Sequence, residues 1–405
     1  MTLIENAKVV LENGILFGGA VLVDGDRIAG VGELSDLAVP EGAETIDAGG
    51  LYVGPGFVDI HVHGGGGAMF HSNPITAARH FLCHGETTVL AALYYDLPKD
   101  DFLAAIDKVK DAMTSPIGAS IKGFYMEGPY MNPAYGASPE KNYWRGEIQP
   151  KDYTEIVDRA GSLARVWAIA PERDGVETFA KYVNEVNPEA VLAVGHSEAN
   201  PDEIGHFKKY GLSIVTHCMD ATGRRAKWVG TRGCGPDEAC MLDEDMYAEL
   251  ICDSAGVHVS PELIRLVLKT KGFDKVILIT DSFVSNENAP EELKAIGDLS
   301  FDAAGNLSGS RLTMDMACRN LMRHTNCGIA QAFLMASRNP ARAIGLGDEL
   351  GTVDTGKIAN LVFCDDMFHV KMVMLNGKVA FLRKETTENA EGVNEAGGYY
   401  SACRS

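Results

Sequence analysis

The stretch FVDIHVH, residues 57–63, is a short apolar run that ends in two histidines. Seven more apolar runs follow it: TTVLAAL (87–93), IKGFYMEGP (121–129), VWAIAPE (166–172), AVLAVGHS (190–197), SIVTHC (213–218), AELICDS (248–254) and KVILITDS (275–282). Helix-like patterns stand between most of them, such as SPELIRLVLKTKG (260–272) before the last run. Eight alternating strand and helix units over about 300 residues predict an α/β fold, the (β/α)8 TIM barrel.

The two ends of the chain have a different pattern. Asp24-Gly25 and Asn376-Gly377 each separate two β-like runs, which predicts hairpins near both termini. Because chain termini often lie close together, we expect both ends to form one small β-sandwich domain. The predicted organisation is therefore a sandwich from residues 1–53 and 352–390, a catalytic barrel from residues 54–351, and a tail from residues 391–405.

Composition limits the classes of partner. The 405 residues carry a formal net charge of −20, which disfavours nucleic acid and anionic membranes, since both select basic surfaces. No apolar run approaches the roughly 18 residues of a membrane span, and the N-terminal residues lack a signal-peptide pattern. The nine cysteines form no CxxC pair. We therefore expect a cytoplasmic protein with reduced thiols.

Polar residues stand at the ends of the predicted barrel strands, where barrel enzymes place their chemistry. Six side chains of metal-ligand or acid–base type occupy the ends of five runs: His61, His63, Glu127, His196, His217 and Asp281. Side chains two apart on a strand face the same way, so His61 and His63 can bind one cation. Imidazole and carboxylate ligands suit Zn²⁺, Fe²⁺ or Mn²⁺. The glycines at 64–67 would let the backbone approach such a metal or a ligand.

Each of these residues alone has an ordinary structural explanation. An HxH pair occurs without a metal, and a single histidine at a strand end is often a hydrogen-bonded core residue. Glu127 could belong to a loop or cap a helix, and Asp281 could cap the helix that follows it. Six such residues in barrel order favour a metal-dependent active site over independent coincidences.

Several motifs together resemble the N-acetylglucosamine-6-phosphate deacetylases of the amidohydrolase superfamily. They include PGFVDIHVHG, MEGPYMNP, GHS, DSAGVHVSP, LITDS and GTVDTGKIANLV, and they run from about residue 50 to 377. The resemblance implies a metal-bearing (β/α)8 barrel, a small β-sandwich built from both termini, and a homodimer.

The resemblance also implies roles for individual residues. Glu127, His196 and His217 match the ligands of one metal ion, and His61 and His63 match a pair that holds a second ion with Glu127 as the bridge. Asp281 matches the catalytic acid and base and is also expected among the metal-binding residues. His258 is expected to assist catalysis by holding the oxyanion or the sugar. The substrate-contacting positions implied by the match are Ala137, Asp220, Ala221, Arg232 and His258, of which Arg232 would reach the phosphate in the partner subunit.

Two positions depart from the family pattern. Ser138 stands where the family usually has a histidine that polarises the substrate carbonyl, and Asp220 stands where it usually has an asparagine near the phosphate. The segment TGRRAKWVGT, residues 222–231, looks longer and more basic than the family's loop, so Arg224, Arg225 and Lys227 could compensate or form a solvated loop.

These observations predict a metal-dependent hydrolase that removes the acetyl group from N-acetylglucosamine 6-phosphate. Asp281 would move the proton between water and the amine nitrogen, while a metal would lower the pKa of water. The alternatives are a related amidohydrolase for another N-acyl amine, N-acyl amino sugar or cyclic amide, and a non-catalytic binding member. The complete set of ligand-type residues argues against the non-catalytic alternative.

Overall fold

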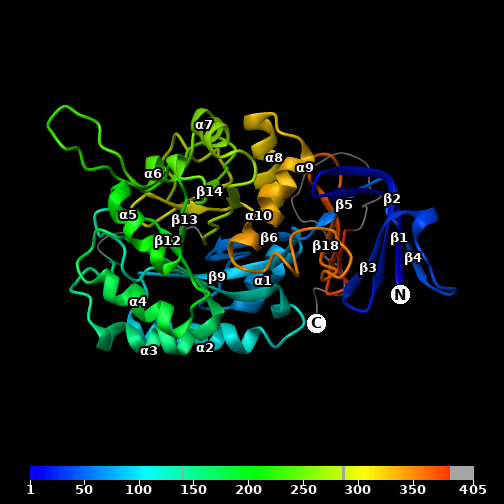
Figure 1. Cartoon of the computed structure of the whole chain (residues 1–405), viewed down its shortest axis with the longest axis horizontal. Helices are drawn as coiled ribbons and strands as arrows, with labels where there is room; N and C mark the ends of the chain where they lie inside the picture. The colour runs from blue at the N-terminus through cyan, green and yellow to red at the C-terminus, as the bar shows by residue number, and fades with distance from the viewer. Residues whose placement is uncertain (138–140, 285–287, 384–405) are drawn as a thin grey trace.

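A computed structural model describes residues 1–137, 141–284 and 288–383. Ser138 and the predicted tail 391–405 lie outside the described residues. The central element is a sheet of eight parallel strands, ordered β15-β14-β13-β12-β11-β10-β9-β6 (Figure 1). The strands are β6 (Phe57–Val62), β9 (Glu86–Tyr94), β10 (Ile121–Glu127), β11 (Ala164–Ile169), β12 (Val191–Val194), β13 (Leu212–Val215), β14 (Tyr247–Ile251) and β15 (Val276–Ile279). All eight predicted strands are confirmed.

The first and last strands of this sheet meet and close the barrel. Beyond β15, the amide of Asp281 donates to the carbonyl of His61 at 3.0 Å, and the amide of His63 donates to the carbonyl of Ser282 at 3.0 Å. These two bonds lie at the carboxyl ends of the strands. Closure therefore brings the residues that follow the first and the eighth strands side by side.

A helix follows each barrel strand along the chain, as the βα alternation predicted. The helices are α1 (Pro74–Leu82), α2 (Lys99–Ala112), α3 (Pro150–Ala160), α4 (Val176–Val186), α5 (Pro201–Phe207), α6 (Pro236–Leu242), α7 (Pro261–Lys271) and α8 (Met314–Thr325). The predicted helix at 260–272 corresponds to α7, and its N-cap Ser260 accepts the amide of Leu263. Among the described helices, none is both long and apolar enough to cross a membrane.

Both ends of the chain contribute to a second eight-stranded sheet beside the barrel (Figure 1). Its order is β20-β19-β18-β5-β1-β2-β3, with β4 paired to β1, and the antiparallel β18–β5 pair joins the C-terminal part to the N-terminal part. The strands are β1 (Thr2–Leu11), β2 (Gly14–Asp24), β3 (Arg27–Glu33), β4 (Glu44–Asp47), β5 (Tyr52–Pro55), β18 (Leu361–Cys364), β19 (Val370–Leu375) and β20 (Lys378–Leu382).

This sheet encloses a hydrophobic core of its own, which includes Val21, Val53 and Phe363. Between β19 and β20 the turn residues Asn376 and Gly377 both have positive φ, 50° and 74°, as a tight hairpin turn requires. The sheet agrees with the expectation that both termini fold together. The domain boundaries at residues 53, 352 and 390 stay a prediction.

Three groups of short elements lie outside the βα repeat and the second sheet. A β-hairpin of β16 (Leu299–Phe301) and β17 (Leu307–Ser310) lies between β15 and α8. After α8 come α9 (Ile329–Phe333), a π-helical turn at Leu334–Arg338 and α10 (Asn339–Ala343). Two short strands, β7 (Gly64–Gly65) and β8 (Ala68–Met69), pair directly after β6.

Candidate active site

The six predicted rim residues come together at the carboxyl ends of the barrel strands. Glu127 is the last residue of β10, and the other five lie at the end of β6 or just beyond β12, β13 and β15. Five of them are 0–5% exposed, and Asp281 is 8% exposed. Charged and imidazole groups this deeply buried require polar partners, and here they are one another's partners.

Glu127 occupies the centre of the site and contacts imidazoles with both carboxylate oxygens. Its Oε1 lies 2.7 Å from Nε2 of His196 and 3.3 Å from Nε2 of His217. The two Nε2 atoms are 3.1 Å apart. Two imidazole nitrogens and one carboxylate oxygen therefore converge on one small volume, which is a suitable donor set for a divalent cation.

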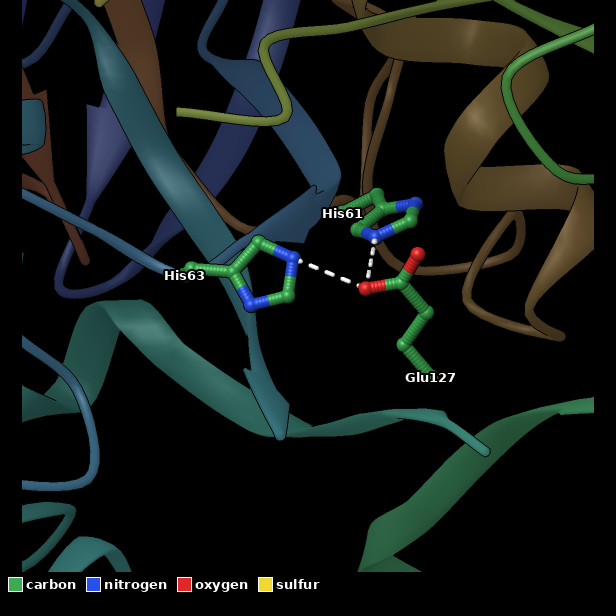
Figure 2. Close-up of side chains that lie close together, drawn as sticks. All are labelled: His61, His63 and Glu127. Carbon is green, nitrogen blue, oxygen red and sulfur yellow. Dashed lines mark ion pairs between the residues drawn. The ribbon is translucent and has the colours of Figure 1, made fainter. Parts of the chain in front are cut away.

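A second cluster forms on the other oxygen of Glu127. Figure 2 shows Nε2 of His61 and of His63 directed at the same carboxylate oxygen, Oε2, at 3.5 and 3.0 Å. Asp281 lies on the open side of this cluster, with Oδ1 3.3 Å from Nε2 of His63 and 3.7 Å from Nε2 of His61. Glu127 is thus common to two potential metal clusters, and Asp281 is next to the second.

The backbone bends sharply where these side chains leave the strands. His196, His217 and Asp281 have φ values of 43°, 29° and 46°, in the left-handed region that non-glycine residues seldom occupy. Such strain persists only where the surrounding structure holds it, and it gathers at functional sites. The bend turns each side chain away from the strand direction and toward the barrel mouth.

The electrostatics of the site favour positive charge at its centre. Burial opposes ionisation of Glu127, but the charge of His61 and hydrogen bonds from His196 and His217 hold its pKa well below the usual range. Burial works against protonation of His63 and His217. Hydrogen bonds to Asp281 and Glu127 nevertheless raise the pKa of His63 to about 9. Glu127 is the main cause that raises the pKa of His217 to about 9. A divalent cation would supply the positive charge that protons otherwise provide.

The far nitrogens of two imidazoles have hydrogen-bond partners that fix the rings. Nδ1 of His61 lies 3.3 Å from Oε2 of Glu249 on β14, and Nδ1 of His217 lies 3.2 Å from the carbonyl oxygen of Asp220. Both partners are acceptors, so each Nδ1 carries a proton, and Nε2 is the nitrogen that faces Glu127 and would bind a cation. Within the part of the chain that the structure describes, the buried Nε2 of His61 forms no hydrogen bond and lies 3.5 Å from Oε2 of Glu127, as expected of a ligand atom.

A cavity of about 480 Å³ opens above the two clusters. The predicted substrate residues Ala137, Asp220, Ala221 and His258 line it, as do Glu127, Asp281 and three of the four imidazoles. Residues that sequence analysis did not single out complete the described wall: Tyr94, Gly136, Phe283 and the segment 306–309 of the β16–β17 hairpin. Among the described lining residues there is no lysine or arginine.

His258 is held from both sides of its ring. Nδ1 lies 3.1 Å from Oδ2 of Asp253, which also accepts the His258 amide at 2.9 Å, and Nε2 lies 3.0 Å from the carbonyl oxygen of Gly309. Burial counteracts protonation, but the hydrogen bond that His258 donates to Asp253 and the charges of Asp220 and Asp281 raise the pKa of His258. The ring is therefore oriented as a donor at the edge of the cavity.

Arg232 differs from the other predicted substrate-contacting residues, Ala137, Asp220, Ala221 and His258, because it does not line the cavity. Its side chain is 71% exposed and pairs with Glu238 at 2.9 Å. It belongs to the loop between β13 and α6, which projects from the barrel in Figure 1. In the same loop, Arg224 pairs with Glu238 and Arg225 with Glu203.

The glycines after His63 have a packing role in the structure. A Cβ on Gly64 would lie 2.4 Å from the carbonyl oxygen of Ala68, and one on Gly65 would lie 2.6–2.7 Å from the rings of His80 and Phe81. These glycines permit close packing of the β7–β8 hairpin and α1. None of the four glycines lines the cavity, and the expectation that they let the backbone approach a metal or ligand stays a prediction.

Comparison with known proteins places this geometry in a family. The amidohydrolase family model matches residues 52–380. The chain belongs to the amidohydrolase family. An N-acetylglucosamine-6-phosphate deacetylase of Bacillus subtilis is 28% identical over 95% of this chain and 98% of its own length, and an N-acetylgalactosamine-6-phosphate deacetylase of Escherichia coli O157:H7 is 29% identical over 80% and 87%.

The solved structures agree with the sequence relatives. The crystal structure of N-acetylglucosamine-6-phosphate deacetylase from Pasteurella multocida has a TM-score of 0.79 and 26% identity, covering 93% of this chain and 99% of that one. The predicted resemblance to these deacetylases is confirmed. As an amidohydrolase, the chain is a hydrolytic enzyme whose imidazole and carboxylate clusters could bind metal.

Proposed function

We propose that this amidohydrolase removes the acetyl group of N-acetylglucosamine 6-phosphate, giving glucosamine 6-phosphate and acetate. The observation that carries the proposal is the sharing of Glu127 between two imidazole pairs, with Asp281 beside the second pair at the base of a cavity. The deacetylases among its relatives indicate the class of substrate. The same reaction on the galactosamine epimer is consistent with one of these relatives.

The donor set fits one or two divalent cations in each subunit. His196, His217 and Glu127 would hold one ion, and His61, His63 and Glu127 a second. We propose zinc, with iron or manganese as alternatives that suit the same nitrogen and oxygen ligands. When bound, such a cation supplies Lewis acidity toward the acyl oxygen and lowers the pKa of water.

Asp281 is the proposed proton carrier. Burial opposes its ionisation, but the hydrogen bond from His63 and the charges of His61 and His63 lower its pKa, so the group is an ionised base at neutral pH. Its carboxylate takes a proton from the water that attacks the acetyl carbonyl carbon. The same proton passes to the amine nitrogen as the carbon–nitrogen bond breaks, leaving acetate.

His258 is proposed to hold the substrate above Asp281. Asp253 fixes the ring and keeps it protonated, so Nε2 can donate to an oxygen of the sugar or of the acyl group once it exchanges its contact with Gly309. Ala137, Asp220 and Ala221 form the rest of the predicted substrate wall. Ser138 cannot be assigned a place in this wall because it lies outside the described residues.

The substrate phosphate requires positive charge that the described wall of one subunit does not supply. We propose that the protein is a homodimer and that Arg232 of one subunit reaches the cavity of the other. The exposure of Arg232 and the projection of its loop support this arrangement. A cytoplasmic location likewise stays a prediction from the sequence.

A second candidate is hydrolysis of another N-acyl amine, N-acyl amino sugar or cyclic amide. Asp220 favours it, because its carboxylate would repel a phosphate and the described lining residues include no lysine or arginine. Under this alternative Arg232 would only stabilise its own loop, through its ion pair with Glu238.

Acetate release by purified protein of measured metal content distinguishes the two candidates. N-acetylglucosamine 6-phosphate and unphosphorylated N-acetylglucosamine are compared in parallel, with the galactosamine epimer as a third substrate. Strong preference for the phosphate, with a loss of about 10²-fold or more in Asp281→Asn at unchanged metal content, supports the proposal. Equal turnover without the phosphate, or no turnover by metal-loaded protein, favours the second candidate and a screen of other amides.

A further inference from the structure

A buried carboxylate behind the metal clusters has no place in the proposed reaction. Glu249 lies in the middle of β14 and is completely inaccessible to solvent. It does not line the cavity, so it cannot touch a substrate. Burying an ionisable group in a barrel core is costly unless its partners compensate for the lost hydration, so the contacts of Glu249 call for an explanation.

One oxygen of Glu249 contacts both candidate metal clusters from behind. Its Oε2 lies 3.3 Å from Nδ1 of His61 and accepts the backbone amide of His217 at 3.3 Å. The hydroxyl of Tyr125 donates to the same oxygen at 3.3 Å, and the Tyr125 ring stacks on His61 at 4.1 Å between centroids. The His61 ring is therefore fixed by a carboxylate on its edge and an aromatic ring on its face.

The type of partner distinguishes His61 from His217. His217 donates its Nδ1 proton to a neutral carbonyl oxygen, whereas His61 donates to a carboxylate. A carboxylate on the far nitrogen makes an imidazole a more basic ligand and fixes which nitrogen faces the metal. Glu249 also adds a negative charge whose described contacts are an imidazole, a hydroxyl and an amide, so a nearby cation would balance it.

We propose that Glu249 is a positioning residue that sets the metal affinity of the His61–His63–Glu127 cluster. The inference rests on the proposed metal-binding role of this cluster and identifies what makes it bind a second ion. In this arrangement β14 contributes no ligand to either ion, yet it controls whether the second ion is retained. The His196–His217–Glu127 cluster depends on Glu249 only through a backbone amide, so its affinity is much less sensitive.

The test is a Co²⁺ titration of the full-length metal-free protein, followed by visible absorption and by competition with a chromophoric chelator. Wild-type protein should bind two ions per chain. Glu249→Gln keeps the size of the side chain and removes its charge, and it should bind the second ion about 10- to 100-fold more weakly while the first is unchanged. No substrate is present, so the result is independent of whether the proposed substrate is correct.

Asp59→Asn is the matched control. Asp59 is also a fully buried barrel carboxylate, and it bonds to the backbone amide of His61 at 3.2 Å and to the hydroxyl of Thr280 rather than to the imidazole ring. We expect this variant to lose thermal stability and to keep the affinity for the second ion. Equal weakening of that ion in both variants would mean a general loss of core structure and would overturn the proposal.

The double variant His61→Gln, Glu249→Gln identifies the path of the effect. If Glu249 acts through His61, the double variant should bind its single remaining ion as tightly as His61→Gln alone. Further weakening of that ion would show that Glu249 acts through His217, contrary to the proposal. Wild-type affinity for both ions in Glu249→Gln, or one ion only in the wild-type protein, would also overturn it.

Discussion

Oε1 of Glu127 lies 2.7 Å from Nε2 of His196, while the opposite oxygen of the same carboxylate lies 3.0 Å from Nε2 of His63. The two histidines come from different sides of the barrel, after β12 and β6. One carboxylate at the end of β10 therefore couples two clusters that the chain supplies from separate strands. This coupling makes Glu127 the residue on which both clusters depend.

Replacing Glu127 should therefore affect both metal sites together. Glu127→Gln removes the negative charge that both imidazole pairs share, and we expect the bound metal to fall from up to two ions per chain to less than one, measured by inductively coupled plasma mass spectrometry. His63→Gln should remove only the second ion. Deacetylase activity should be lost in Glu127→Gln because the metal is lost.

A surface pair offers a matched control for this prediction. Glu177 contacts Nε2 of His206 at 2.9 Å, a distance similar to that in the site, but both side chains are about half exposed. Glu177→Gln should keep the wild-type metal content. Full metal content in Glu127→Gln would mean that the carboxylate is not a ligand.

Much of the site could be predicted because barrel topology converts sequence position into spatial position. His61, His196 and Asp281 are far apart in sequence, but each directly follows an apolar run. Parallel strands separated by helices place all their carboxyl ends on one rim, so residues with this local pattern must converge. The side-chain period of two in a β-strand also predicted that His61 and His63 face the same side.

The rest of the site depends on contacts that local patterns do not encode. Glu249 looks like a polar interruption of a strand, and only the closed barrel, with side chains of β14 and β6 directed into its interior, shows that it meets His61. The carbonyl oxygen of Gly309 meets His258 across 51 residues of chain, through a hairpin that sequence analysis did not identify. The sequence carries no signal for the left-handed backbone at His196 either, because glycine is the usual marker of positive φ and a histidine occupies this position.

Gly136 is a second position where packing decides the geometry of a ligand. Its φ is 101°, and a Cβ there would lie 2.3 Å from the hydroxyl of Tyr95 and 2.7 Å from Nδ1 of His196. Gly136→Ala should push the His196 ring away from Glu127 and weaken the first metal ion by about 10-fold or more. The Co²⁺ titration described above measures this change.

The control for this change separates backbone strain from displacement of the ligand. Gly42 also has a positive φ of 80°, but a Cβ on it would meet nothing within 4 Å. Gly42→Ala should cost about 1 kcal/mol of unfolding free energy and leave metal affinity unchanged. Equal metal affinities in the two alanine variants would contradict the predicted displacement of His196.

The proposed contribution of Arg232 to the partner's cavity predicts complementation between two impaired variants. Arg232→Ala should raise KM for N-acetylglucosamine 6-phosphate, and Asp281→Asn should abolish kcat. In a mixed dimer, one cavity combines an intact Asp281 with the partner's intact arginine. When the two variants assort at random, the co-expressed mixture should therefore have about a quarter of wild-type activity. A different affinity tag on each variant shows that mixed dimers have formed.

The same experiment carries its own negative control. The double variant Arg232→Ala, Asp281→Asn co-expressed with Asp281→Asn has no cavity with an intact Asp281 and should stay inactive. If mixed dimers form but restore nothing, the arginine acts within its own subunit or not at all. A protein that sediments as a monomer would contradict the shared cavity directly.

Asp315, far from the proposed chemistry, should make folding stability depend on pH. It is buried at the start of α8, and burial opposes its ionisation. The hydrogen bond and charge of His84 and the charge of Arg319 outweigh burial and lower the pKa of Asp315 to about 2. A carboxylate whose folded pKa lies below its unfolded pKa stabilises the fold above the unfolded value and loses that contribution as pH falls through the folded value.

Asp315→Asn should therefore lower the free energy of unfolding by roughly 2 kcal/mol at about pH 5 to 6, measured by urea denaturation. The difference from wild type should shrink as pH falls from about 4 to about 2, because the wild-type carboxylate then takes up a proton. Comparing both proteins at each pH cancels any loss of metal that they share.

Asp47 is a fitting control, since its pKa is also lowered, by the amide of Gly49 and by Asn6, at a solvent-exposed turn. Asp47→Asn should change the urea midpoint much less, and a difference for Asp315→Asn that persists undiminished at pH 2 would assign its effect to packing rather than charge.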